Sequence, residues 1–486
     1  MPISLDNTGA GRARLSFLAS FSEKYTLLLL NTAGAMVLAR LLTPADVGLY
    51  AIGAVLAGLV QVVRDFGVGA YLVQEKQLDR AKLRAALGMS MLVGWLLAAL
   101  VFAAGPLAAW FYREPRLQMV VQLLAVNFLL LPFSALALPC LRRQLRFAAI
   151  FAINLSQTVA QLVCGVWLAW LGLGYLSLVW GALAGAAAGV LASLCCRPAE
   201  LPWLPGWRGI GAIWRFGSVA TGGTVIDEAG VAAPDLVIGK LIGVAEVGIF
   251  GKAMGVINVF NQLVTAAVSP VIFPVYAARA RQGADMSAAY LTTASYVTAL
   301  AWPFFGFVAL LAPAIVRALY GDQWDAAVPL IRVVCIGAAL YSVFGMARYL
   351  LVAMGEVGAQ ARLDASAVPL RIAALLLAAP FGLLWVAWAI VAGAVFRSWL
   401  TYRVLHRLGG VRWQPLLVAV RKSAAIALVC LAGPALAALT IDARWLELPA
   451  AAGSCAVLWL LAVVLVRHEL ADECRNAGRK ALAWRH

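Results

Sequence analysis

The sequence has few charged residues, few histidines and no regular cysteine pattern. Asp, Glu, Lys and Arg make up 12% of its 486 residues, about half the share in an average globular domain. The three histidines lie far apart, and the eight cysteines show no Cys-x-x-Cys spacing. These shortages argue against a water-soluble chain, and they predict neither a metal site nor a disulfide framework nor a bound cofactor.

Long apolar runs take the place of the missing polar residues. Hydrophobic residues make up 64% of the chain, and the mean hydropathy is +0.90. Runs of about 20 residues, enough to cross about 30 Å of hydrocarbon, recur from end to end. The sequence therefore predicts an all-α polytopic membrane protein. We expect fourteen transmembrane helices, near residues 18–39, 46–66, 86–107, 117–138, 147–170, 175–194, 214–237, 246–268, 289–311, 325–345, 363–380, 384–402, 418–438 and 447–466.

The positions of the basic residues predict the orientation in the membrane. The net charge is +16, which in a soluble protein would suggest nucleic-acid binding. With the N-terminus in the cytoplasm, 26 of the 38 Lys and Arg residues fall on the cytoplasmic side and six on the external side. Lys and Arg concentrate in cytoplasmic loops of membrane proteins. We therefore expect both termini in the cytoplasm and no nucleic-acid partner.

An internal repeat separates equivalent positions by 200 residues. Residues 38–50 and 238–250 match at Arg40 with Lys240, Asp46 with Glu246, and Gly48 with Gly248. Common turn chemistry, an acidic residue beside a small one, is the alternative explanation. A repeat unit of six helices predicts two lobes of equal orientation, related by a pseudo-two-fold axis along the membrane normal. The predicted domains are 1–196 for helices one to six, 197–410 for helices seven to twelve, and 411–486 for two further helices and a tail.

Ionisable residues inside the predicted helices are candidate site residues. A charge at mid-bilayer costs several kcal/mol unless it faces water or a partner. We assign binding of an anionic group to Lys24, Arg64, Lys252, Arg332, Arg371 and Arg397, and ion coupling to Glu23, Asp227, Glu228 and Asp235. The alternative is that such residues reach to the interface or form buried structural pairs.

Uncharged polar residues form two stripes at helical spacing. They are Asn154, Gln157 and Gln161 in one predicted helix, and Asn258, Asn261 and Gln262 in another. Hydrogen bonds between helices, worth about 0.6 kcal/mol each, would need only one or two of them. We therefore expect a water-filled cavity in which amides bind sugar hydroxyls and basic side chains bind phosphate.

Two stretches carry a family resemblance. The run Leu-Ala-Arg-Leu-Leu-Thr-Pro-Ala-Asp-Val-Gly-Leu-Tyr at residues 38–50, followed by Arg-Asp-Phe-Gly at 64–67, resembles the polysaccharide transporter (Wzx-type oligosaccharide flippase) family of the MATE-like MOP superfamily. The likeness is close over residues 15–85. It implies a two-lobed bundle that moves undecaprenyl-diphosphate-linked oligosaccharide across the bacterial inner membrane by alternating access, for O-antigen, capsule or exopolysaccharide assembly. It further implies a monomer, with a polysaccharide polymerase as a partner.

Two other functions fit parts of this pattern. A MATE-like multidrug or cation antiporter shares the fold, but a cavity for cationic drugs should be acidic. A membrane glycosyltransferase, polymerase or ligase needs a sizeable external loop or soluble part, and the sequence has no Asp-x-Asp motif for a metal-bound sugar nucleotide. We therefore predict a transporter and not an enzyme.

Overall fold

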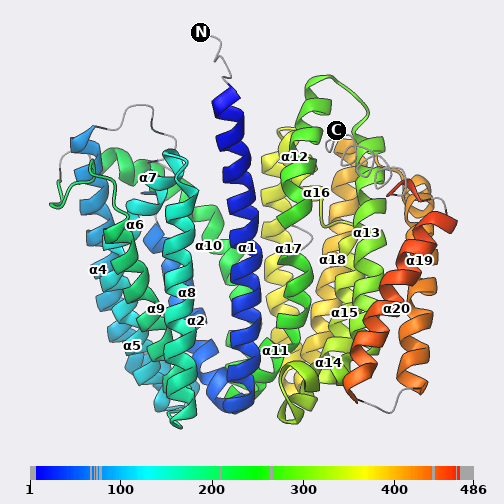
Figure 1. Cartoon of the computed structure of the whole chain (residues 1–486), viewed down its shortest axis with the longest axis horizontal. Helices are drawn as coiled ribbons and strands as arrows, with labels where there is room; N and C mark the ends of the chain where they lie inside the picture. Colours follow the sequence, from blue (N-terminus) through cyan, green and yellow to red (C-terminus); the bar gives the residue numbers. More distant parts are fainter. Residues whose placement is uncertain are drawn as a thin grey trace. The chain divides into compact units, whose positions relative to one another are not determined.

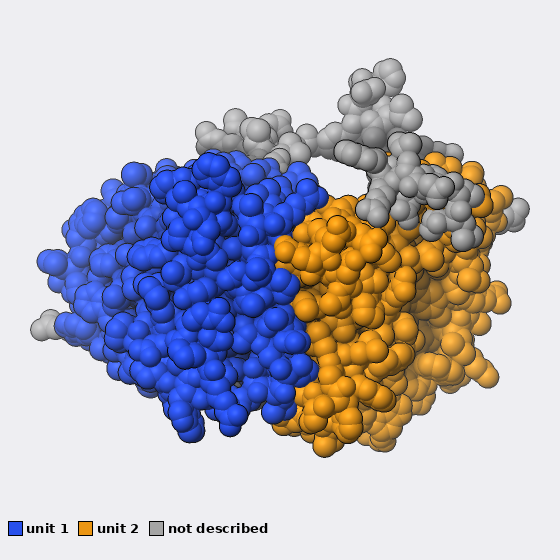
Figure 2. All heavy atoms as spheres, turned by 90° about the horizontal axis from the view of Figure 1, so that it is seen from below, with its two compact units in different colours: residues 1–248 blue, residues 249–486 orange. Residues whose placement is uncertain are grey.

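Helices make up every regular element that the structure describes (Figure 1). It is a computed structural model, and it describes residues 7–470 apart from 66–67, 70–71, 73–74, 76–78, 208–209, 263–265, 441–443 and 467. Along some helices only the backbone is described. The all-α class predicted from the sequence is confirmed. The chain divides into two compact units, Met1–Gly248 and Ile249–His486 (Figure 2).

Ten helices in the described residues are long and apolar enough to cross a membrane. An eleventh span is present if the bent pair Arg116–Leu130 and Pro132–Arg143 counts as one. The chain is therefore a multi-pass membrane protein. The count of fourteen stays a prediction, because the spans expected at 18–39, 214–237 and 246–268 fall on helices that are only partly described.

The first unit contains the helices up to the turn near residue 242, which is the second copy of the repeated turn. They are α1 (Asn7–Leu41), α2 (Pro44–Asp65), α4 (Arg80–Tyr112), α5 (Arg116–Leu130), α6 (Pro132–Ala135), α7 (Ala137–Arg143), α8 (Phe147–Trp170), α9 (Tyr175–Cys195), α10 (Ile210–Leu241) and the start of α11 (Val244–Phe260). Within it α8 packs along α9 and α1, while α10 packs on α2 and α4. The unit thus includes α10, which the sequence-based division at residue 197 assigned to the second lobe.

The second unit contains the rest of α11 and all later elements. These are α12 (Ala266–Arg281), α13 (Met286–Leu310), α14 (Ala312–Leu319), η2 (Asp322–Ala327), α15 (Val328–Ser342), α16 (Ala347–Ala353), α17 (Val357–Ala378), η3 (Ala379–Phe381), α18 (Leu383–Gly409), α19 (Trp413–Thr440) and α20 (Arg444–Leu465). α15 and α17 both pack on α18, and α13 packs on α15 and α19 (Figure 1). The last two helices therefore belong to the second compact unit.

One predicted helix is broken. The sequence predicts a continuous span at 117–138, but α5 ends at Leu130 and the chain bends by 41° before it continues at Pro132. A proline has no N–H to donate and its ring excludes the preceding turn from regular helix. The ring also lies close to α4, where a Cβ added at Gly94 would be 2.8 Å from Pro132 Cγ. The predicted span at 117–138 therefore corresponds to a bent pair of helices, and it stays a prediction that the pair crosses the membrane as one span.

The helix breaks in the two repeats fall at equivalent positions. α1 ends at Leu41 and α10 at Leu241, while α2 begins at Pro44 and α11 at Val244. Both pairs differ by 200 residues, as the sequence repeat requires. The turn chemistry of the repeat therefore ends and starts helices at the same places in both copies.

Asp46 joins the starts of two helices in the first unit. Its Oδ2 accepts hydrogen bonds from Thr43 N at 3.2 Å and Thr43 Oγ1 at 2.6 Å. Thr43 Oγ1 in turn accepts from Asp46 N at 3.2 Å. This reciprocal pair is a capping box at the start of α2. The other carboxylate oxygen, Oδ1, accepts from Tyr175 N at 3.1 Å and so caps α9 as well.

We expect the Asp46→Ala variant to lose about 2 kcal/mol of stability, because a cap and one further hydrogen bond are worth about 1 kcal/mol each. Thermal unfolding of the purified chain, followed by tryptophan fluorescence, measures this loss. Asp79 is the matched control, since it accepts from Lys82 N at 2.7 Å and caps α4 alone. Asp79→Ala should lower the melting temperature about half as much; equal losses would contradict a double role for Asp46.

Candidate functional site

A cavity of about 310 Å³ lies within the second unit. Residues of α15, α17 and α18 line it, together with the end of α11. Its volume is near the lower end of the range for ligand pockets, roughly 300–1,000 Å³. Most of the lining is apolar, and the polar groups come from four residues: Asn261, Tyr341, Arg371 and Arg397. The cavity thus combines an apolar wall with a few polar groups, as small-ligand sites do.

Two glycines let the lining helices approach each other. A Cβ added at Gly337 of α15 would be 3.3 Å from Val391 Cα of α18, so the two helices are in close backbone contact there. A Cβ added at Gly393 of α18 would be 3.5 Å from Arg371 Cγ, so the arginine stem lies beside the glycine. Small residues at these two positions therefore allow α18 to lie close to α15 and to the Arg371 side chain.

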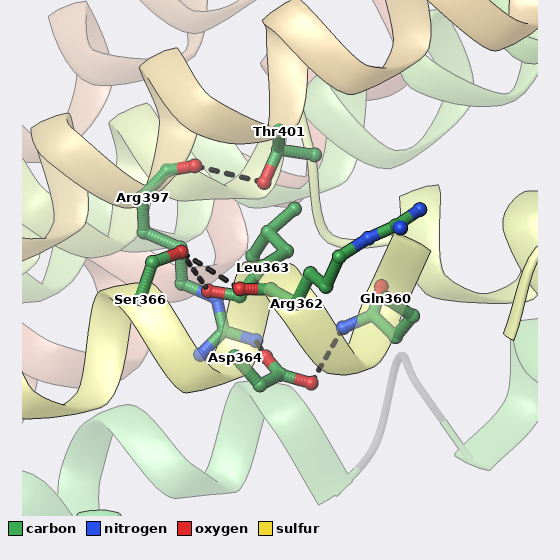
Figure 3. A network of polar contacts seen from close by, with 7 residues as sticks. All are labelled: Gln360, Arg362, Leu363, Asp364, Ser366, Arg397 and Thr401. Carbon is green, nitrogen blue, oxygen red and sulfur yellow. Dashed lines mark hydrogen bonds and ion pairs between the residues drawn. The ribbon is translucent and has the colours of Figure 1, made fainter. Parts of the chain in front are cut away.

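A partly buried ion pair holds Arg397, which lines the cavity (Figure 3). Arg397 Nη2 lies 2.6 Å from Asp364 Oδ1, and Gln360 Nε2 donates to Asp364 Oδ2 at 2.8 Å. Asp364 is only 8% exposed. The Arg397 guanidinium also lies 5.6 Å from the ring centroid of Tyr341. Because a lone buried charge is costly, the contact between Asp364 and Arg397 offsets part of the cost of removing both side chains from water.

Two guanidinium groups line the cavity. They belong to Arg371 and Arg397, and Arg397 is paired with Asp364. A guanidinium presents several N–H donors in a plane and matches the oxygens of phosphate and carboxylate. The arrangement is therefore suited to hold an anionic group, with Tyr341 and Asn261 close by for neutral hydroxyls.

The structure brings some of the predicted basic residues together and separates others. Arg371 and Arg397 share the cavity. Arg332 is exposed outside its lining, and its Nε donates to Ala309 O at 3.3 Å. Lys252 is half-buried, with Nζ 4.9 Å and 5.1 Å from the ring centroids of Tyr320 and Trp324. Lys24 is exposed on α1, and the Arg64 side chain lies outside the described residues.

The two polar stripes have different surroundings. On α8, Gln157 and Gln161 lie against glycines of α9, where a Cβ added at Gly185 would be 2.8 Å from Gln161 Cβ. This part of the stripe packs α8 on α9, and Asn154 next to it is half-buried. In the second unit, Asn258, Asn261 and Gln262 are all exposed, and of these three Asn261 lines the cavity.

The predicted ion-coupling residues lie in the first unit. Glu228 and Asp235 are half-buried on α10. The side chains of Glu23 and Asp227 lie outside the part of the chain that the structure describes. Neither Glu228 nor Asp235 lines the cavity of the second unit, and a role of the four residues in coupling stays a prediction.

Sequence reasoning missed Asp364 and Gln360. Asp364 is the one acidic residue in the predicted span 363–380. Gln360, Asp364 and Arg371 are spaced by four and seven residues, which places them on one helix face. The sequence therefore contains a signal for this pair: a carboxylate on the same helix face as a basic residue inside one predicted span.

Comparisons with known proteins agree with the fold. The profile of a family described as polysaccharide biosynthesis protein matches residues 37–329. The chain is 24% identical over 342 residues to the teichuronic acid biosynthesis protein TuaB of Bacillus subtilis (strain 168), with 68% of each chain covered. It is 22% identical over 325 residues to the lipopolysaccharide biosynthesis protein WzxC of Escherichia coli (strain K12), with 66% of each covered. Among solved structures it is similar to lipid II flippase MurJ in an inward closed conformation, with a TM-score of 0.76, 11% identity, and 94% of this chain and 99% of that chain covered.

Proposed function

The chain belongs to the polysaccharide biosynthesis protein family, and on this premise we propose that it is a lipid-linked oligosaccharide flippase. It moves undecaprenyl-diphosphate-linked repeat units from the cytoplasmic to the periplasmic leaflet of the bacterial inner membrane, by alternating access. The product serves assembly of O-antigen, capsule or exopolysaccharide, with a polysaccharide polymerase as partner. The chain acts as a monomer with both termini in the cytoplasm, and it catalyses no covalent step.

The observation that carries this proposal is the positively charged cavity inside a multi-pass member of this family. Arg371 and Arg397 bind an anionic group of the substrate, while Tyr341 and Asn261 contact sugar hydroxyls. The prenyl chain stays in lipid, because burying its apolar surface in a small cavity would gain nothing over the bilayer. Lys24, Arg64, Lys252 and Arg332 are proposed to guide the anion outside this cavity. The proposed coupling residues remain Glu23, Asp227, Glu228 and Asp235.

A MATE-like multidrug or cation antiporter is the second candidate. A cationic drug would meet the guanidinium groups of Arg371 and Arg397 in this cavity, and the carboxylate of Asp364 beside the wall is already paired with Arg397. Like charges repel strongly at low dielectric. The charge of the cavity therefore favours an anionic substrate over a cationic one.

Deletion of the gene in its host tests the proposal. We expect lipid-linked saccharide to accumulate in the membrane and surface polysaccharide to disappear, as measured by chromatography of extracted lipids and by immunoblotting. Expression of the wild-type chain from a plasmid should reverse both changes. A deletion strain that changes only its sensitivity to cationic dyes would favour the antiporter, and sugar transfer by the purified chain would favour an enzyme.

A further inference from the structure

The ion pair at the cavity differs from another Arg–Asp pair in the same unit. Arg317 contacts Asp325 with two nitrogens, Nε at 3.1 Å and Nη2 at 2.7 Å. Arg397 contacts Asp364 through Nη2 alone. Its Nε is buried and has no hydrogen-bond acceptor among the described residues. A buried donor without an acceptor costs free energy, so the guanidinium of Arg397 is incompletely satisfied by Asp364.

Asp364 has a second donor that does not depend on Arg397. Gln360, one turn earlier on α17, donates to the other carboxylate oxygen at 2.8 Å. If Arg397 turned to another anion, Asp364 would keep this hydrogen bond and its place in the helix. The loss of the ion pair is therefore less costly than for a carboxylate held by arginine alone.

Arg371 provides the other half of an anion site. It lines the same cavity as Arg397, and its stem lies beside Gly393 of the helix that carries Arg397. An anion with two or more oxygens placed in the cavity would accept hydrogen bonds from both side chains.

From these contacts we propose that Asp364 is the resident counter-ion of the cavity, which an anionic group of the substrate displaces from Arg397. The inference rests on the proposed function for the identity of the substrate, and it adds the residue that sets how tightly the anion binds. In the empty cavity Asp364 occupies Arg397 and prevents an uncompensated charge. In the loaded cavity the incoming oxygens take its place on Nη2 and reach the unused Nε.

The ligand is an anionic group and not a whole oligosaccharide. A cavity of about 310 Å³ accepts a group the size of one sugar or one diphosphate. Two sources supply such oxygens: the diphosphate of the lipid carrier, or the carboxylate of an acidic sugar. Both would use the same two arginines.

Binding to the purified full-length chain in lipid nanodiscs tests the inference, with farnesyl diphosphate and glucuronic acid as separate probes. Asp364→Asn removes the competing charge, and we expect the Kd to fall roughly tenfold, the worth of one charge-assisted hydrogen bond. Arg397→Gln should raise the Kd by a similar factor. The double variant Asp364→Asn/Arg397→Gln should not show the lower Kd expected for Asp364→Asn, because the side chain at position 364 affects binding only through Arg397. Tightening for one probe alone identifies the source of the anion.

Two further variants keep the test decisive. Asp325→Asn makes the same chemical change in the exposed pair with Arg317 and should leave the Kd unchanged. Gln360→Leu removes the donor that holds Asp364 when Arg397 leaves, so this variant should weaken binding, opposite in sign to Asp364→Asn. If Asp364→Asn folds, unchanged or weaker binding by this variant would overturn the proposal. If it does not fold, tighter binding by Gln360→Leu would overturn it. Binding of neither probe by the wild-type chain would overturn it as well.

The two proposals can fail separately. If the Kd values follow the expected pattern but deletion of the gene leaves lipid-linked saccharide unchanged, the flippase proposal fails and the role of Asp364 stands. If saccharide accumulates but the Kd values do not respond to Asp364, the flippase proposal stands without this mechanism.

Discussion

Replacing Gly48 with alanine should sharply reduce the amount of folded protein. A Cβ at this position would overlap the carbonyl oxygen of Val244 and lie 2.8 Å from its carbonyl carbon. A Cβ at Gly248 would overlap the carbonyl oxygen of Pro44 in the same way. Both contacts lie within the first unit. The first turns of α2 and α11 therefore touch through their backbones at two glycines that the repeat places in equivalent positions.

The expected cost is large because backbone atoms cannot rotate away. Overpacking against side chains typically costs about 1–3 kcal/mol, and here a whole helix turn must move, so we expect at least about 3 kcal/mol. This is a large fraction of a typical total stability of about 5–15 kcal/mol. Size-exclusion chromatography of a fluorescently tagged chain and its melting temperature in detergent measure the effect.

The same helices supply matched controls. A Cβ added at Gly58 of α2 or at Gly251 of α11 would meet no other atom within 4 Å. Alanine also has a better helix propensity than glycine, by up to about 1 kcal/mol. Gly58→Ala and Gly251→Ala should therefore keep or raise the melting temperature. A Gly48→Ala protein with wild-type yield and melting temperature would show that the two turns do not need this close contact.

Much of this architecture follows from local patterns. The ends of α8 at Phe147 and Trp170 agree with the predicted span, because an uninterrupted apolar run defines both. The capping box of Thr43 and Asp46 is readable as a spacing of three residues. The contact between Gly48 and Gly248 is not readable in this way, since the repeat predicts that the two positions are equivalent but not that they touch.

The candidate site shows the same division between local and tertiary information. Its basic residues were predicted one by one from their cost in a membrane. Which of them share a cavity depends on the rotation of each helix about its axis, because this rotation decides whether a side chain faces a neighbouring helix or lipid. Arg371 and Arg332 were equivalent in the sequence, and packing separates them. The pairing of Arg397 with Asp364 likewise required the distance between α17 and α18.

Because Arg371 lines the cavity and Arg332 does not, we expect Arg371→Ala to abolish nearly all export. Loss of a hydrogen bond to a charged group costs about 1.5–3 kcal/mol, which corresponds to a decrease of roughly 10- to 150-fold at about 1.4 kcal/mol per factor of ten. The measurement is surface polysaccharide and accumulated lipid-linked saccharide in the deletion strain, with chain abundance determined by immunoblotting. Arg371→Lys should retain part of the export, because it keeps the charge but loses the planar set of donors.

Arg332→Ala is the matched control, since it removes the same side chain from the next lining helix at an exposed position outside the cavity. Because Arg332 is proposed only to guide the anion outside the cavity, we expect a much smaller loss of export than for Arg371→Ala. If both alanine variants lose export equally at normal abundance, positive charge across the whole second unit matters and not the cavity. Normal export by Arg371→Ala would assign Arg371 to packing beside Gly393 and would remove the cavity from the transport path. The contrast between two arginines on helices that both line the cavity therefore tests the position of the site, and not merely the need for positive charge.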